Sequence, residues 1–86
     1  MTKQLEVSLT QLAIAVKISM ELTDIDKQNF LKSLNFIQKE IRKSHQERSD
    51  ELIKSKIKNM RIIVANTRII QTLWNACHSK ILANFL

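Results

Sequence analysis

Residues 50–86 read DELIKSKIKNMRIIVANTRIIQTLWNACHSKILANFL, and their apolar positions repeat with helical spacing. Steps of four and three residues alternate along this segment, as in coiled-coil-like helix packing. We call the resulting row the seam; it comprises Ile53, Ile57, Met60, Ile63, Thr67, Ile70, Trp74, Cys77 and Ile81. The pattern predicts one long helix over residues 50–85.

A second apolar row lies beside the seam and widens the apolar surface beyond what one partner helix normally covers. This second row comprises Ile62, Ala65, Ile69, Leu73 and Ala76. A helix over residues 50–85 would be roughly 55 Å long at 1.5 Å per residue, so shorter upstream helices cannot cover it. We therefore expect a second copy of the chain or a helical protein partner to pack near its end. The expected interface residues are Ile63, Ile70, Leu73, Trp74, Cys77, Ile81 and Phe85.

Two shorter amphipathic helices are predicted upstream of this segment. The first spans residues 2–22, where the apolar positions are Leu5, Leu9, Leu12, Val16 and Met20. The second spans residues 24–43, where the apolar positions are Phe30, Leu34, Ile37 and Ile41. Between them, Thr23 or Asp24 can cap the second helix, because a side-chain oxygen there accepts from a free backbone N–H.

The polar stretch at residues 43–50 predicts a turn between the second and third helices. Ser44-His45-Gln46-Glu47 has the pattern of a capping box, and Ser49 before Asp50 and Glu51 is a competing N-cap. Nothing in the stretch forbids helix, so a continuous helix through it is the alternative.

Composition predicts an all-α domain over residues 1–86. Of the 86 residues 44% are hydrophobic and 26% charged, which is ordinary for a folded chain. Glycine and proline are both absent, so the residues on which tight hairpins and phosphate-cradling loops depend are missing. We expect an antiparallel helical hairpin or a three-helix bundle with a long C-terminal helix, completed by self-association or by a partner.

The net charge of +6 arises entirely after Glu51, because no acidic residue follows it. Four of the basic residues there lie within about 80° of one another around a helix at 100° per residue. We call these the basic stripe; it comprises Lys54, Lys58, Arg61 and Arg68. Such a stripe can meet an acidic protein surface or a phosphate backbone, or it can simply be a solvated face.

The sequence does not indicate an enzyme, a metal site or a cofactor. Adjacent residues on a helix point about 100° apart, so Cys77 and His78 cannot form a nucleophile–base pair within one helix. Trp74 and Cys77 belong to the seam, which favours packing roles, although an intersubunit disulfide through Cys77 is the alternative if two seams meet. With one cysteine and no signal-peptide pattern, we expect a reducing cytoplasmic location.

These patterns favour a small helical protein-interaction module of the chaperone, inhibitor, immunity or assembly-subunit type. It would form a homo-oligomer or bind a helical protein partner that has an acidic surface. Binding would use the apolar face and the basic stripe of the C-terminal helix. The alternative is a dimeric helical regulator that binds nucleic acid. A membrane partner is disfavoured, because Lys80 is the only charged residue after Arg68 and the apolar runs are too short to span a bilayer.

Overall fold

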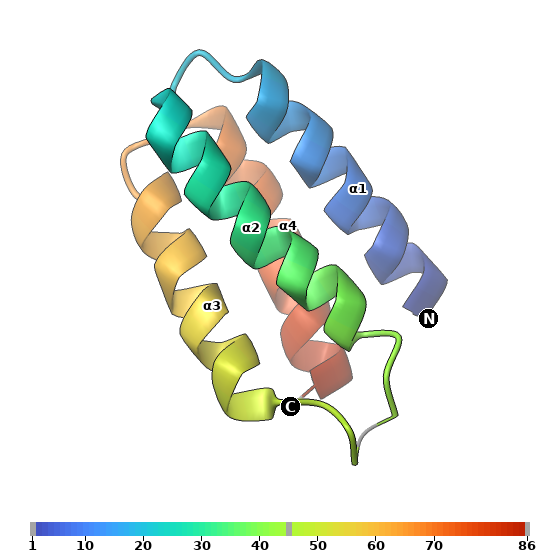
Figure 1. Cartoon of the computed structure of the whole chain (residues 1–86). Helices are drawn as coiled ribbons and strands as arrows, with labels where there is room; N and C mark the ends of the chain where they lie inside the picture. Colours follow the sequence, from blue (N-terminus) through green and yellow to red (C-terminus); the bar gives the residue numbers. More distant parts are fainter. Residues whose placement is uncertain (1, 45, 86) are drawn as a thin grey trace.

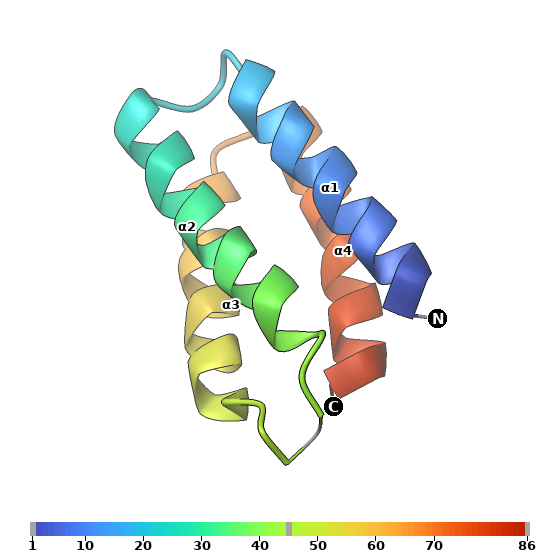
Figure 2. The same cartoon turned by 45° about the vertical axis from the view of Figure 1, so that its right-hand side comes forward.

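The computed structural model describes residues 2–44 and 46–85, which form four helices (Figure 1). These are α1 (Thr2–Ile18), α2 (Asp24–Glu40), α3 (Asp50–Val64) and α4 (Ile69–Phe85). Each helix runs antiparallel to the one before it (Figures 1 and 2). Helices α1 and α3 both pack against α2 and α4, so the four form a closed ring around one core. The described part of the chain has no β-strand, and the all-α prediction is confirmed.

The predicted long helix over residues 50–85 is wrong. The chain leaves the helix after Val64, turns through residues 65–68 and returns along α3 as α4. The longest dimension of the molecule is 38 Å, which could not contain a helix of roughly 55 Å. The hairpin and three-helix arrangements are therefore replaced by a four-helix bundle, and self-association stays a prediction.

The turn after α3 forms without a glycine, and the described residues include none with a positive φ angle. The Thr67 hydroxyl donates to the Val64 carbonyl oxygen at 2.7 Å, and the Thr67 backbone N–H donates to the same oxygen at 3.0 Å. A threonine side chain that bonds a nearby carbonyl gives the backbone an alternative to the helical ladder. These two hydrogen bonds join Thr67 to Val64, the last residue of α3, so contacts within the turn itself end the helix.

Glu21, in the α1–α2 connection, caps the start of α4. Its carboxylate accepts hydrogen bonds from the backbone N–H groups of Arg68 at 2.6 Å, Ile69 at 3.2 Å and Ile70 at 3.5 Å. The first N–H groups of a helix have no partner within it and carry partial positive charge, so an anionic acceptor stabilises them. A residue 47 positions earlier in the chain therefore caps α4.

Glu40 has the same role at the other end of the bundle, at the start of α3. Its side chain is 2% exposed; Oε1 accepts from the Ser49 backbone N–H at 2.8 Å, and Oε2 pairs with Lys43 Nζ at 2.5 Å. The hydrogen bonds from Lys43 and then from Ser49 hold the pKa of this carboxyl below its ordinary value of 4.5. One carboxylate thus binds the start of α4, and another binds the N-cap residue of α3.

The pKa of Glu40 predicts a loss of stability in acid. Because its carboxylate is favoured in the folded state, its contribution is complete above pH 4.5 and is lost as the pH falls through the lower folded-state pKa. Replacing Glu40 with glutamine should remove this part of the dependence, so the urea midpoints of the two proteins should converge as the pH falls below 4.5. Circular dichroism melts in urea between pH 3 and pH 7 measure this; midpoints that stay equally far apart throughout would contradict it.

The helix boundaries agree with the predicted turns and shorten the predicted helices. Thr23 caps α2, its hydroxyl oxygen accepting from the Asp26 N–H at 3.1 Å, as one of the two predicted caps. The predicted turn in residues 43–50 is confirmed, with Ser49 as the N-cap residue of α3. The competing capping box includes His45, which lies outside the described residues.

One core lies between the four helices. Most of the apolar positions predicted for α1 and α2 are buried in it: Leu5, Leu9, Leu12, Val16, Phe30, Leu34, Ile37 and Ile41. Met20 was expected to extend this row but is 99% exposed. The reason is that α1 ends at Ile18, where the Ser19 hydroxyl accepts from the Glu21 N–H at 3.0 Å and the chain leaves the helix.

Candidate interaction surfaces

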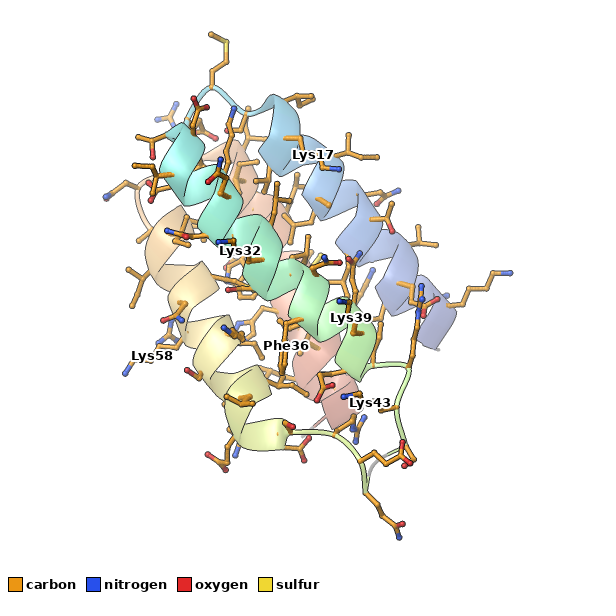
Figure 3. All side chains as sticks on the ribbon, viewed as in Figure 1. Lys17, Lys32, Phe36, Lys39, Lys43 and Lys58 are labelled. Atoms are coloured by element: carbon orange, nitrogen blue, oxygen red, sulfur yellow. The ribbon has the colours of Figure 1, made fainter. Side chains whose placement is uncertain are left out.

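The turn after Val64 divides the basic stripe. Lys54, Lys58 and Arg61 are exposed on α3 and lie within about 60° of one another around that helix. Figure 3 shows Lys58 extending from the outer side of α3. Arg68 instead lies in the connection before α4, where its backbone N–H is bound by Glu21. The structure thus keeps three members of the stripe together and places the fourth at the Glu21 end of the bundle.

Further lysines on α1 and α2 enlarge the basic surface. Figure 3 shows Lys17, Lys32 and Lys39 on the face formed by α1 and α2. Among the described residues, none of these three lies within 4 Å of a carboxylate oxygen. The sequence reading missed them because residues 1–51 are neutral in sum. Several acidic side chains of residues 1–51 bind other groups: Glu21 and Glu40 accept from backbone N–H groups at helix starts, and Glu6 pairs with Arg42 at 3.3 Å.

A groove of about 350 Å³ lies between α2 and α3. Its lining residues are Asn29, Lys32, Ser33, Lys56, Asn59, Ile62 and Ile63. Below it, Lys56 Nζ lies 5.8 Å from the centre of the Phe36 ring, within the range of a cation–π contact. The groove is therefore a mixed site on two helices, cationic through its lysines and apolar through Ile62 and Ile63, and only Ile63 of its lining was predicted to belong to an interface.

The core of this chain takes up most of the predicted apolar interface. Side chains of four of the seven predicted residues are at most 4% exposed: Ile70, Trp74, Cys77 and Ile81. They are covered by other helices of the same chain, because α4 packs against α1 and α3. Ile63 is half-buried beside the groove and Leu73 is 38% exposed, so both remain accessible. Phe85 is the last residue of α4, and its side chain lies outside the described part of the structure.

A different apolar surface remains exposed where α1 ends and α4 begins. We call it the apolar patch; it comprises Ile14, Ile18, Met20, Ile69 and Leu73. Ile18, Met20 and Ile69 border a hollow of about 310 Å³ whose floor includes Ala15 and Ile70. Exposures of 75% for Ile18, 99% for Met20 and 69% for Ile69 leave these side chains almost wholly in water. Ile69 and Leu73 belong to the second apolar row, which the sequence placed beside the seam.

Trp74 packs at the centre of the core and is 1% exposed. Its ring meets Phe30 edge-on, with centroids 6.0 Å apart, and stacks on His78 with centroids 5.3 Å apart. Its buried Nε1–H finds no acceptor among the described residues. Burial, and then the charge of Arg61, lower the pKa of His78 below 6.5, so the imidazole is neutral at pH 7. The packing role predicted for Trp74 is in the core of its own chain.

Cys77 is also part of the core, next to α1. Its Sγ donates to the Ser8 carbonyl oxygen at 3.4 Å, and burial raises the pKa of the thiol above 9.0. A thiol with a raised pKa is a poor nucleophile at pH 7, because the thiolate is the reactive form. An intersubunit disulfide would require α1 to move away from the thiol.

Groups that could serve other chemistry are few in the described residues. Within residues 2–44 and 46–85, no three His, Cys, Asp or Glu side chains are grouped so that they could hold a metal ion. None of the four helices is both long and apolar enough to cross a bilayer.

Comparison with known proteins adds no relative: no family model, curated protein or solved structure matches this chain.

Proposed function

We propose that this protein is a small helical interaction module that acts by binding rather than by catalysis. Its partner is an apolar helix of another protein, flanked by acidic residues, which lies on the apolar patch. The observation that carries the proposal is the exposure of Ile18, Met20 and Ile69 around one apolar hollow. Contiguous exposed aliphatic side chains of this kind mark protein–protein contact sites.

The geometry of the apolar patch suits a helix as its occupant. Helices α1 and α4 run antiparallel and side by side, and the patch includes residues of both helices around the hollow. Ile14 lies one turn before Ile18, and Leu73 lies one turn after Ile69, so both extend the patch in the same direction along the bundle. Covering roughly 300 Å² of apolar surface would contribute a gross ~7 kcal/mol, from which the costs of association are subtracted.

Charge at the edge of the apolar patch favours an acidic partner. Arg68 is exposed and directly precedes Ile69, whereas Lys17, next to Ile18 in sequence, lies on the α1–α2 side of the bundle. The Glu21 carboxylate also lines the hollow, where its charge is offset by the α4 N–H groups from which it accepts hydrogen bonds. A second copy of this chain would bring an identical cationic edge, and like charges facing each other oppose association. A different protein with acidic flanks is therefore the better match.

The test is a matched pair of double variants in a partner-binding assay. A partner isolated with the wild-type protein would be purified and its affinity measured by calorimetry. Replacing Ile18 and Ile69 with lysine should weaken binding at least about tenfold, because hot-spot side chains cost 2 kcal/mol or more. The control replaces Val7 and Leu52 with lysine; these are 50% and 52% exposed, lie outside the apolar patch and should leave affinity within about twofold.

Two outcomes of this assay would contradict the proposal. One is equal loss of affinity in both double variants, which would show that the added charge rather than the apolar patch matters. The other is a wild-type dimer, measured by light scattering, that only the Ile18 and Ile69 changes dissociate, which would assign the patch to self-association. Circular dichroism establishes that all variants remain helical.

Nucleic acid is the second candidate partner. The observation in its favour is that Lys54, Lys58 and Arg61 on α3 add to the exposed lysines of α1 and α2. Binding of this kind would fall steeply between roughly 50 and 200 mM salt, because it depends on counterion release. Binding at the apolar patch would persist over the same range.

A further inference from the structure

We propose that the groove between α2 and α3 is a binding site for a phosphate group. The groove is built from Asn29, Lys32 and Ser33 on α2 and from Lys56 and Asn59 on α3. It involves neither α1 nor α4, which carry the apolar patch, so it does not depend on the proposed protein partner. The ligand class follows from the arrangement, charge and hydrogen-bonding capacity of these five side chains.

The antiparallel packing of α2 and α3 places the lysines and asparagines of the two walls in a staggered order. Lys56 lies over the ring of Phe36, and Lys32 precedes Phe36 by one turn on the same face of α2, so the two lysines lie within about one turn of each other across the groove. Asn29 precedes Lys32 by three residues, and Asn59 follows Lys56 by three. Because the helices run in opposite directions, both asparagines lie toward the same end. The groove thus presents two lysines and two asparagines, one of each from either helix.

The lysine pair has no protein counter-ion. Neither Lys32 nor Lys56 forms an ion pair within the described residues. Along the two helices, Glu40 is held by Lys43 and Ser49 and Glu51 by Lys54, while Asp26 lies six residues before Lys32, in the first turn of α2. Two ammonium groups facing one groove repel each other, and an anion placed between them would relieve that repulsion.

Ser33 adds a hydroxyl donor to the wall of the groove. Its side chain is 5% exposed and makes no hydrogen bond to the other described residues, and its oxygen is reached by water from the groove. The hydroxyl can therefore exchange that water for an anionic acceptor.

The donor set of the groove suits phosphate better than a carboxylate. Two ammonium groups, two carboxamide N–H₂ groups and one hydroxyl can donate to a single anion. A phosphate monoester carries close to two negative charges at pH 7 and three strong acceptor oxygens, whereas a carboxylate carries one charge and two oxygens. A tetrahedral oxyanion can therefore use donors from both walls at once.

The experiment is a titration with inorganic phosphate at constant ionic strength, followed by ¹⁵N NMR. Saturable shifts are expected at the side-chain amides of Asn29 and Asn59 and at the backbone around Ser33 and Lys56. Replacing Lys32 and Lys56 with glutamine should weaken binding roughly tenfold or more, since two charge-assisted hydrogen bonds are lost. The matched control replaces Lys39 and Lys58 with glutamine; it removes the same charge outside the groove and should change affinity by less than about twofold.

Each other result would overturn the phosphate site. Shifts that stay linear in phosphate concentration would show diffuse ion association. Equal weakening of phosphate binding in the two double variants would show general electrostatic attraction to the protein's positive charge. Polyglutamate that saturates the groove as tightly as phosphate would show that carboxylates suffice. A short oligothymidylate strand whose binding depends as much on Lys39 and Lys58 as on Lys32 and Lys56 would assign the whole basic face to a nucleic-acid backbone instead.

Discussion

Replacing Trp74 with alanine is expected to destabilise the protein by about 3–5 kcal/mol, the usual cost of removing a large aromatic side chain from a core. Trp74 is 1% exposed and contacts Phe30 on α2 and His78 on α4, so the cavity would lie between helices and could not collapse easily. An 86-residue domain has a total stability of about 4–13 kcal/mol at typical values per residue. The variant should therefore lose a large part of its stability, which circular dichroism in urea measures as a lower unfolding midpoint.

The control for Trp74 is phenylalanine. This change keeps a ring against Phe30 and His78 and removes the buried Nε1–H that lacks an acceptor. Its cost should be below about 2 kcal/mol, because lost volume is offset in part by removal of an unpaired donor. A loss of less than about 1 kcal/mol for the alanine variant would mean that Trp74 is not in the core described here.

Replacing Glu21 with alanine is expected to cost about 1–2 kcal/mol, the range for losing a helix N-cap. The change would free the N–H groups of Arg68, Ile69 and Ile70 and remove the negative charge that faces the start of α4. The apolar patch would lose order as well, since Ile69 belongs to both features. Urea unfolding gives the stability change, and amide hydrogen exchange at Ile69 and Ile70 should accelerate more than exchange in α3.

Asp24 is the matched control for Glu21. It is an exposed acidic residue of the same end of the bundle, in the first turn of α2, so its replacement with alanine removes the same charge without touching α4. We expect a loss below about 1 kcal/mol for this variant. Equal losses in the two variants, or unchanged exchange at Ile69 in the Glu21 variant, would contradict the capping role.

Helical periodicity in the sequence correctly predicted which faces of the helices are buried. Leu9, Phe30 and Trp74 are all at most 1% exposed, because an amphipathic helix must place its apolar face in a core whatever the topology. In α3 the buried row differs from the predicted seam by one position: Val64 is buried, and Ile63 lies beside the groove. Periodicity gives a face of the helix, and the neighbouring helix decides which of two adjacent residues is covered.

The turn at residues 65–68 could not be predicted in the same way. Asn66 and Thr67 are weak helix residues, but the seam continues through Thr67 without interruption. The decisive contact is the Glu21 carboxylate on the N–H groups of α4, and it joins residues 47 or more positions apart. Folding α4 back also buries Trp74 within its own chain, with no need for a partner protein. This gain in stability exists only once the four helices are assembled.

The candidate surfaces depend on the same assembly. The apolar patch joins Ile18 to Ile69, and the groove joins Lys32 to Lys56. Each pair lies on two helices that only their packing brings together. The sequence therefore showed the residue types of the candidate surfaces, a basic stripe and a second apolar row, but gave no way to tell which of them share a surface.

The measurement that tests the four-helix arrangement most directly is a spin-label distance between α3 and α4. Cysteines would replace the exposed Ser55 and Ser79, in a background where Cys77 is alanine, and both would be spin-labelled. Because α3 and α4 pack side by side, with axes of packed helices about 8–10 Å apart, we predict a label separation below about 20 Å. A single narrow distance near 36 Å, the length of one continuous helix between these positions, would contradict the turn and with it both candidate surfaces.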